Sequence, residues 1–221
     1  MYNRSAIASF DVDAQKTFTP LCPNELPVPE GHLIADALNE QATFASVRVG
    51  SKDAHTPHAV WVATEENPQF SAVNLPNSDI RWNLHAVPGT QGFELLDALP
   101  AVEDYDFFVW KGVEPNIHPY GACYHNLNWQ EKKMSTGVIE YLKLRGIKLV
   151  LVGGLATDFC VKNTALQLKD AGFDVVLNLK ASRGVAAEST QIAIAELSNA
   201  GVAVVTDIAA YLSTTEQQLG L

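Results

Sequence analysis

Four residues with reactive side chains stand at the ends of three apolar runs of this sequence. Cys160 follows "KLVLVGG" by a few residues, Lys111 follows "FFVW", and Asp11 and Asp13 fall in "FDVDAQ". A cysteine at the start of a helix can be a nucleophile, because the unpaired backbone N–H groups favour its thiolate and can hold an oxyanion. Asp11 could take the thiol proton, and the ammonium of Lys111 could stabilise the developing charge. One catalytic site would explain all three strand ends.

Each of these residues also has a simpler explanation. Cys160 could be a buried structural thiol, because free cysteine is among the most buried residue types. Asp11 could cap a helix or loop, and Lys111 could pack its stem while its head reaches water. The combination is more specific than any one member of it.

A second group of residues could bind a metal ion. Asp53 and His55 form an Asp-x-His pair in "KDAHTPH", His58 follows closely, and His85 lies in the next long stretch. One carboxylate and two imidazoles, with positions left for water, suit a divalent ion such as Zn, Fe or Mn. Because Asp-x-His is short and common, these could equally be loop histidines on the surface. The other histidines have no comparable spacing: His32, His118 and His125.

Strands and helices must alternate to position these residues. The apolar runs are rich in β-branched and aromatic residues, as buried parallel strands are. Strands are predicted at Ala6–Val12, Thr43–Val49, Asp106–Trp110, Lys148–Gly154, Asp174–Leu179 and Val202–Thr206. Helices are predicted at His32–Gln41, Lys132–Gly146, Cys160–Gly172 and Ala186–Gly201. The pattern indicates an α/β fold, a doubly wound parallel sheet with helices on both faces, whose sites form at the carboxyl ends of the strands.

Two long stretches do not fit the alternation, and long loops in a compact domain are often functional. They are Thr56–Leu99 and Gly112–Gln130. We expect one domain spanning residues 1–221, since this length supports a substantial single core.

Composition narrows the function classes. The formal net charge of −10 argues against nucleic acid or an anionic membrane as the main partner. No apolar run approaches the length of a membrane span, and the N-terminal residues do not form a signal peptide. Three cysteines without CxxC spacing suit a reducing compartment, so we expect a cytoplasmic protein.

Five segments in order resemble the isochorismatase-like cysteine hydrolases, in particular their nicotinamidase branch. These segments are "FDVDAQKTF", "DAH", "WNLHAVPGTQG", "WKGVEPNIHPYGA" and "GGLATDFCVKNTA", and the match spans nearly the whole chain. The resemblance implies a six-stranded parallel sheet in three layers, with Asp11, Lys111 and Cys160 as the catalytic triad. Two departures stand out: His58 follows the Asp-x-His pair unusually closely, and "HPYGACYHN" replaces the more usual "DSYSAF" form.

The resemblance also implies the rest of a site. A cis peptide between Leu155 and Ala156 would help to build an oxyanion hole from the N–H groups of Ala156 and Cys160. Phe18 and Trp82 match aromatic residues that hold a pyridine ring, although each, taken alone, would more often be a core residue. The matching metal ligands, for one divalent ion, are Asp53, His55 and His85.

The ligand set favours nicotinamide as the substrate, because other branches of the family generally lack it. We expect hydrolysis to nicotinate and ammonia through a thioester on Cys160, as part of NAD salvage, by a homo-oligomer. One alternative is a related amidohydrolase for another small amide such as pyrazinamide. Another is a non-enzymatic binding or redox-sensing protein, which would not need Asp11 or Lys111 beside Cys160. A nucleotide-binding domain is disfavoured, because "VGGLATDF" is not the G-x-G-x-x-G pattern.

Overall fold

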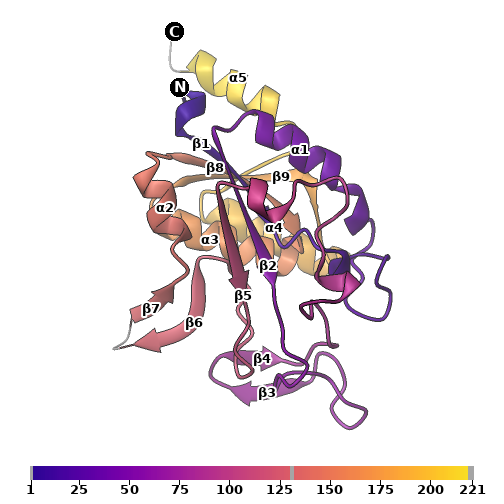
Figure 1. Cartoon of the computed structure of the whole chain (residues 1–221). Coiled ribbons are helices and arrows are strands. Elements are labelled where there is room, and N and C mark those ends of the chain that lie inside the picture. The colour runs from indigo at the N-terminus through magenta and orange to yellow at the C-terminus, as the bar shows by residue number, and fades with distance from the viewer. Residues whose placement is uncertain (1, 130–131, 219–221) are drawn as a thin grey trace.

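A six-stranded parallel sheet forms the centre of the molecule. The computed structural model describes residues 2–129 and 132–218. The strand order across the sheet is β10-β9-β8-β1-β2-β5, and every neighbouring pair is parallel (Figure 1). The strands are β1 (Ile7–Val12), β2 (Val47–Asp53), β5 (Phe107–Lys111), β8 (Leu149–Leu155), β9 (Asp174–Arg183) and β10 (Ala203–Val205). The predicted doubly wound α/β fold is therefore confirmed.

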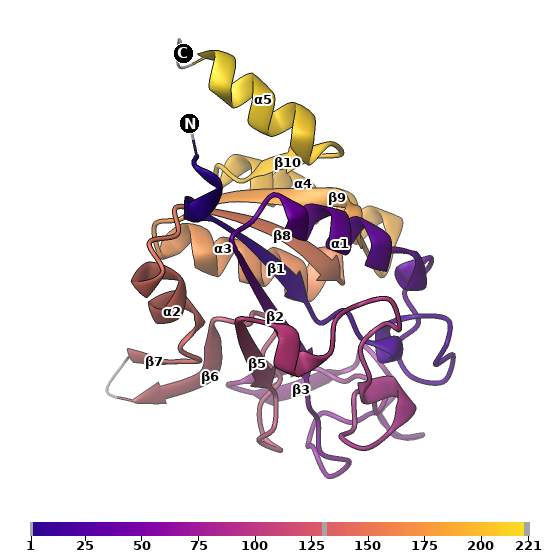
Figure 2. The same cartoon turned by 45° about the horizontal axis from the view of Figure 1, so that its top comes forward.

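Helices cover both faces of this sheet and complete the three layers. One face carries α1 (Ala35–Thr43) and α5 (Ile208–Gln218), which lie on the same side of the strands in Figure 2. The other face carries α2 (Val138–Leu144), α3 (Lys162–Asp170) and α4 (Ala187–Asn199). Helix α5 had no predicted counterpart in the sequence.

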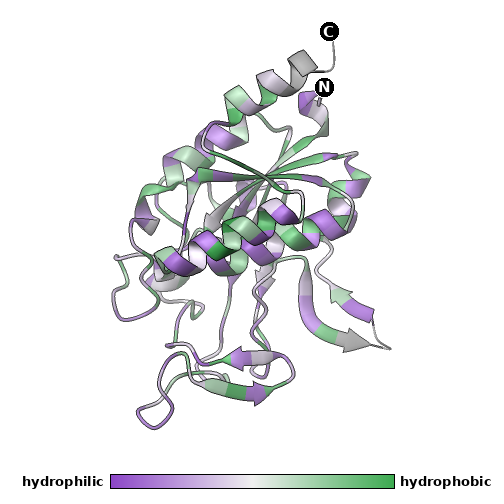
Figure 3. Ribbon diagram, turned by 180° about the vertical axis from the view of Figure 1, so that it is seen from behind, coloured by the Kyte–Doolittle hydropathy of each residue, from purple (hydrophilic) through white to green (hydrophobic). Residues whose placement is uncertain are grey.

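The core follows from strands that are apolar on both sides. All seven residues of β8 are buried, as are all six of β1. In Figure 3 the central strands are mostly hydrophobic, whereas the helices carry hydrophobic and hydrophilic stripes. Alternate β1 residues pack on opposite helical layers, with Phe10 against the α2–α3 side and Ile7 against the α5 side. Burial of this kind is the main stabilising contribution to such a sheet.

The structure differs from the predicted helix at Lys132–Gly146. Residues Lys132–Ser135 form strand β7, which pairs with β6 (Tyr124–Trp129) in an antiparallel hairpin. The helix α2 begins only after Gly137, whose φ of 90° is not helical and ends any continuous helix through this point. The prediction was therefore wrong for the first part of this segment. Gln130, the last residue of a predicted long stretch, lies outside the described residues.

The long stretches contain short regular elements of their own. Strands β3 (Ala72–Leu75) and β4 (Ser78–Ile80) form a second antiparallel pair, beyond the ends toward which β2 and β5 point (Figure 1). Short 3-10 turns occupy Arg4–Ala6, Lys16–Phe18, Gly31–Leu33, Gln91–Phe93 and Val102–Asp104. None of the described helices has the length and apolar character that crossing a membrane requires.

Candidate active site

Lys111 is the centre of a buried polar group at the carboxyl ends of four adjacent strands. It is the last residue of β5, and its register partner in β2 is Asp53. The ammonium Nζ lies 3.0 Å from Asp13 Oδ2 and donates to Asp53 Oδ1 and, at 3.0 Å, to the carbonyl of Pro119. The Sγ atom of Cys160 lies 3.7 Å from the same nitrogen. The structure therefore brings Lys111 and Cys160 together in one buried group.

The carboxylate that completes this group belongs to Asp13, which follows β1 directly. The chain leaves the strand there with a φ of 45° at Asp13, a conformation that aspartate tolerates better than most residues. Ser51 Oγ donates to Asp13 Oδ1 at 2.6 Å, and the Gln15 amide pairs with the backbone of Asp53. These bonds tie the ends of β1 and β2 together. Carboxylate oxygens of Asp13 and Asp53 and the Cys160 sulfur all lie within 4.8 Å of one another.

The predicted base Asp11 requires a correction. Its Oδ2 accepts from Arg48 Nε at 2.9 Å, from Arg48 Nη2 at 2.6 Å and from the Tyr105 hydroxyl at 2.9 Å. Asp11 is still within the regular strand, on the same side as Ser9, whose hydroxyl accepts from Gln41 of α1. The carboxylate therefore joins an ion pair on the α1 face, whereas the one beside Lys111 and Cys160 is that of Asp13.

Cys160 lies in a π-helical turn, Thr157–Val161, between β8 and α3, and not within the first turn of a regular α-helix. The peptide before this turn, Leu155–Ala156, is cis, as the resemblance implied. Gly154 approaches β1 so closely, with a φ of 130°, that an added Cβ would lie 1.9 Å from the carbonyl oxygen of Val12. Only glycine fits this position, so the turn is placed tightly against the end of β1.

Burial and charge set the protonation of the group. Burial raises the pKa of the Cys160 thiol well above its ordinary value; Lys111 opposes this change, and the carboxylates of Asp13 and Asp53 add to it. Burial also raises the pKa of Asp13, against the opposing effect of Lys111. Burial would raise the pKa of Asp53 too, but Lys111 and His55 outweigh it and hold that pKa far below its usual range. For Lys111, the two carboxylates outweigh burial, and its pKa rises. The resting site therefore holds a thiol beside a carboxyl of raised basicity.

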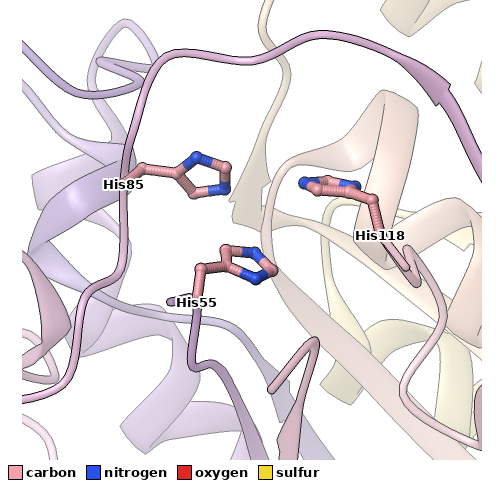
Figure 4. A group of neighbouring side chains, drawn as sticks. All are labelled: His55, His85 and His118. Carbon is pink, nitrogen blue, oxygen red and sulfur yellow. The ribbon is translucent and has the colours of Figure 1, made fainter. Parts of the chain in front are cut away.

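Three imidazoles form a second buried group next to the first. The rings of His55, His85 and His118 surround a common space (Figure 4), and one nitrogen of each lies within 4.8 Å of the other two. His55 Nε2 is also 3.5 Å from Asp53 Oδ1. Burial, with the neighbouring His55, lowers the pKa of His85 to about 3 and that of His118 well below its ordinary value. Neutral imidazoles keep lone pairs that a metal ion can bind.

The backbone of this second group leaves room for the rings. Gly112 has a φ of 70°, and a Cβ there would lie 2.3 Å from His55 Cε1. The predicted ligands Asp53, His55 and His85 are all in the neighbourhood, whereas His58 is exposed. His118 was not predicted. The available signal was the departure of "HPYGACYHN" from the usual "DSYSAF" form, which begins at His118.

A pocket connects the two groups. It encloses about 330 Å³ of space, its mouth included, and Asp53, His85, His118 and Cys160 contribute to its wall. The remaining lining is mostly apolar and aromatic, and it contains both predicted ring-binding residues: Phe18, Leu26, Trp82, Tyr120, Ala156, Phe159 and Val185. Such a pocket suits a small, flat, mostly apolar ligand with few polar groups.

Comparisons with known proteins agree with this architecture. A nicotinamidase of Acinetobacter baylyi is 32% identical over 177 residues, which are 79% of this chain and 79% of that protein. A solved nicotinamidase and pyrazinamidase structure from Acinetobacter baumanii has a TM-score of 0.81 at 28% identity, covering 91% of this chain and 96% of the other. The pyrazinamidase of Pyrococcus horikoshii in complex with zinc has a TM-score of 0.71 at 27% identity, covering 91% and 99%. The isochorismatase domain model matches residues 12–210, and the chain therefore belongs to the isochorismatase family.

Proposed function

We propose that this protein hydrolyses nicotinamide to nicotinate and ammonia through a thioester on Cys160. The observation that carries the proposal is the position of the Cys160 thiol, in the wall of an aromatic pocket and in contact with Lys111. The family membership and the similarity to nicotinamidases point to the same reaction.

Asp13 is the base in this proposal. As the sulfur of Cys160 attacks the amide carbonyl carbon, the thiol proton passes to Asp13, whose pKa burial has raised toward the range useful for a general base. A C–S bond forms and the carbonyl becomes an oxyanion, which the N–H groups of Ala156 and Cys160 would hold. The C–N bond then breaks, and the leaving nitrogen takes the proton from Asp13 and departs as ammonia.

The second half of the reaction reverses these roles. A water molecule attacks the thioester carbonyl and gives a proton to Asp13. The C–S bond breaks, the sulfur takes this proton from Asp13, and the product leaves as nicotinic acid, which ionises to nicotinate. Throughout, Lys111 remains a cation between Asp13 and Asp53 and next to the sulfur, so it stabilises negative charge on Cys160.

Asp53, His55 and His85 would hold one divalent metal ion. Three buried atoms of these residues have no hydrogen-bond partner within the described part of the chain, and all are oxygen or nitrogen donors: Asp53 Oδ2, His55 Nε2 and His85 Nε2. Such orphaned donors fit a divalent ion. When bound, the ion supplies a Lewis-acidic position for the pyridine nitrogen, which orients the amide toward Cys160. Phe18 and Trp82 would contact the faces of the ring.

The test is release of ammonia and formation of nicotinate from nicotinamide. Wild-type protein should turn over, and Cys160→Ala should fold normally and lose nearly all activity. Cys22→Ala is the matched control, because Cys22 is also buried but does not line the pocket. A folded Cys160→Ala variant that keeps substantial activity would refute the thioester route. Wild-type protein that hydrolyses pyrazinamide but not nicotinamide would favour a different amide as the substrate.

A further inference from the structure

We propose that His118 is a direct ligand of the metal ion, so that the centre contains three imidazoles and not two. This inference rests on the proposed metal site and extends it to a residue from the loop after β5. The ion that this site would bind is a divalent metal ion, and zinc is the ion used in the experiment.

The hydrogen bonds of two of the imidazoles fix where their lone pairs point. His55 Nδ1 is 2.9 Å from the carbonyl oxygen of Gly112, and His85 Nδ1 is 2.7 Å from that of Asn83. A carbonyl oxygen only accepts, so each Nδ1 carries the proton and each Nε2 presents a lone pair. Metal-binding histidines commonly use such backbone carbonyls to set their tautomer. Both Nε2 atoms face the space that His118 also borders (Figure 4).

His118 itself has an unsatisfied ring in that space. Its side chain is buried, and neither ring nitrogen has a hydrogen-bond partner among the residues that the structure describes. A buried polar group without a partner is costly, and each one in a native structure calls for an explanation. Ligation through one nitrogen explains that nitrogen, since one nitrogen of His118 lies within 4.8 Å of a nitrogen of each of the other two imidazoles.

The ring of His118 is held firmly enough to serve as a ligand. It lies roughly parallel to His55, with centroids 5.0 Å apart and planes 22° apart, and edge-on to Trp61 at 4.5 Å. Its backbone N–H donates to the carbonyl of Asn77 at 2.9 Å. The next residue, Pro119, accepts from Lys111 Nζ, so the loop that carries His118 is tied to the proposed catalytic lysine.

The neighbouring charges explain why a third imidazole is useful here. One oxygen of Asp53 is committed to Lys111, which leaves Oδ2 for a metal ion. A third neutral donor completes a protein coordination shell without adding a carboxylate to a site that already holds Asp13 and Asp53. Because His85 and His118 both line the pocket, the ion would face the substrate space.

The experiment measures zinc binding without reference to catalysis. Wild-type protein is stripped with a chelator, and zinc is titrated back in competition with a chromophoric chelator. The variants are His118→Phe, which keeps a ring between Trp61 and His55, His85→Ala as a ligand-loss reference, and His58→Asn as an exposed-histidine control. Loss of a group that only supports a ligand weakens metal binding about 10- to 100-fold, so loss of a ligand should weaken it at least about 100-fold. X-ray absorption of the zinc form should show one imidazole fewer in His118→Phe.

The outcomes separate this inference from the proposed function. The inference holds if His118→Phe and His85→Ala both lose zinc affinity while His58→Asn does not. It is wrong if His118→Phe, with an unchanged circular dichroism spectrum, binds zinc like wild type. In that case His85→Ala can still lose affinity, and the proposed site stands without His118. Should His118→Phe fail to fold, His118→Asn replaces it and the same titration decides. Wild-type protein that binds no zinc, but hydrolyses nicotinamide, overturns the inference and leaves the reaction intact.

Discussion

Asp11 and Asp13 are two buried carboxyl groups at the end of one strand, and burial raises the pKa of both. Their partners differ. Asp11 accepts from a guanidinium and a phenol, which satisfy and neutralise one of its oxygens. Asp13 shares Lys111 with Asp53 and has the Cys160 thiol in reach. Burial raises the pKa of both groups, but only Asp13 lies beside the Cys160 thiol, and our proposal of Asp13 as the catalytic carboxylate rests on this difference.

The sharpest way to break this comparison is to neutralise each carboxylate in turn. Asp13→Asn should lower kcat for nicotinamide by about 10²–10⁴-fold, the range usual for a lost general base. Asp11→Asn should leave kcat within about a factor of two to three, because Asp11 belongs to the Arg48 ion pair. Steady-state ammonia release by the two variants checks this. The reverse order of effects would restore Asp11 as the base.

The next test addresses stability. Arg48→Met removes the cation from Asp11 while keeping an apolar stem, and it should lower the free energy of unfolding by about 3–5 kcal/mol, as for other broken buried pairs. Arg48 is 16% exposed at its side chain, which places the loss nearer the lower figure. Chemical denaturation measures it. An equal loss from Lys180→Met, whose exposed pair with Glu40 is worth little, would show that the effect is not specific to the buried pair.

The same variant should have a distinct pH dependence. Arg48 lowers the pKa of Asp11 against the effect of burial, so its loss raises that pKa further above the unfolded value. Between the unfolded and the folded pKa of Asp11, the folded state then binds more protons than the unfolded state, so stability falls as pH rises through this range. The stability difference between wild type and Arg48→Met should therefore be smaller at pH 5 than at pH 8. A difference that grows toward acid pH would contradict this account.

Smaller effects are expected from the two hydroxyl donors. Tyr105→Phe removes one bond to Asp11 and should cost about 1.5–3 kcal/mol of stability with kcat unchanged, as for hydrogen bonds to charged groups. Thermal denaturation and kcat are measured on one preparation. A change in kcat without a change in stability would contradict this prediction, because it would indicate that Tyr105 acts on the proposed base Asp13 and not on Asp11.

Ser51→Ala should have the smallest effect and should act on catalysis. The Ser51 hydroxyl lowers the pKa of Asp13, so its removal should raise that pKa and move the acidic limb of the kcat/KM profile to higher pH. At neutral pH, kcat should change by about tenfold or less, the value of one hydrogen bond. A shift of the limb to lower pH would show that Asp13 does not set it.

Some parts of the fold and of the site were predictable from the sequence, and others were not. The strands before Lys111 and Cys160 were predictable, because uninterrupted apolar runs between helical segments specify a parallel sheet. The choice between Asp11 and Asp13 was not predictable, because the two-residue period of a strand places both side chains on the same side of the sheet. The positive φ at Asp13, which turns the chain away from the strand, is not visible in the sequence. His118 lies in a long loop without periodicity, so its approach to His55 depends on tertiary packing that no local pattern encodes.

The sheet order also has a consequence for synthesis of the chain. β1 lies between β2, which is made soon after it, and β8, which is made much later. Until β8 leaves the ribosome, one edge of β1 has no partner, and unpaired strand edges favour aggregation. Cys160 follows β8 in the chain, so the proposed nucleophile joins the site only when the central strand acquires its second neighbour. Incomplete chains should therefore be inactive and depend on chaperones, and release of the full chain should bring stability and activity together.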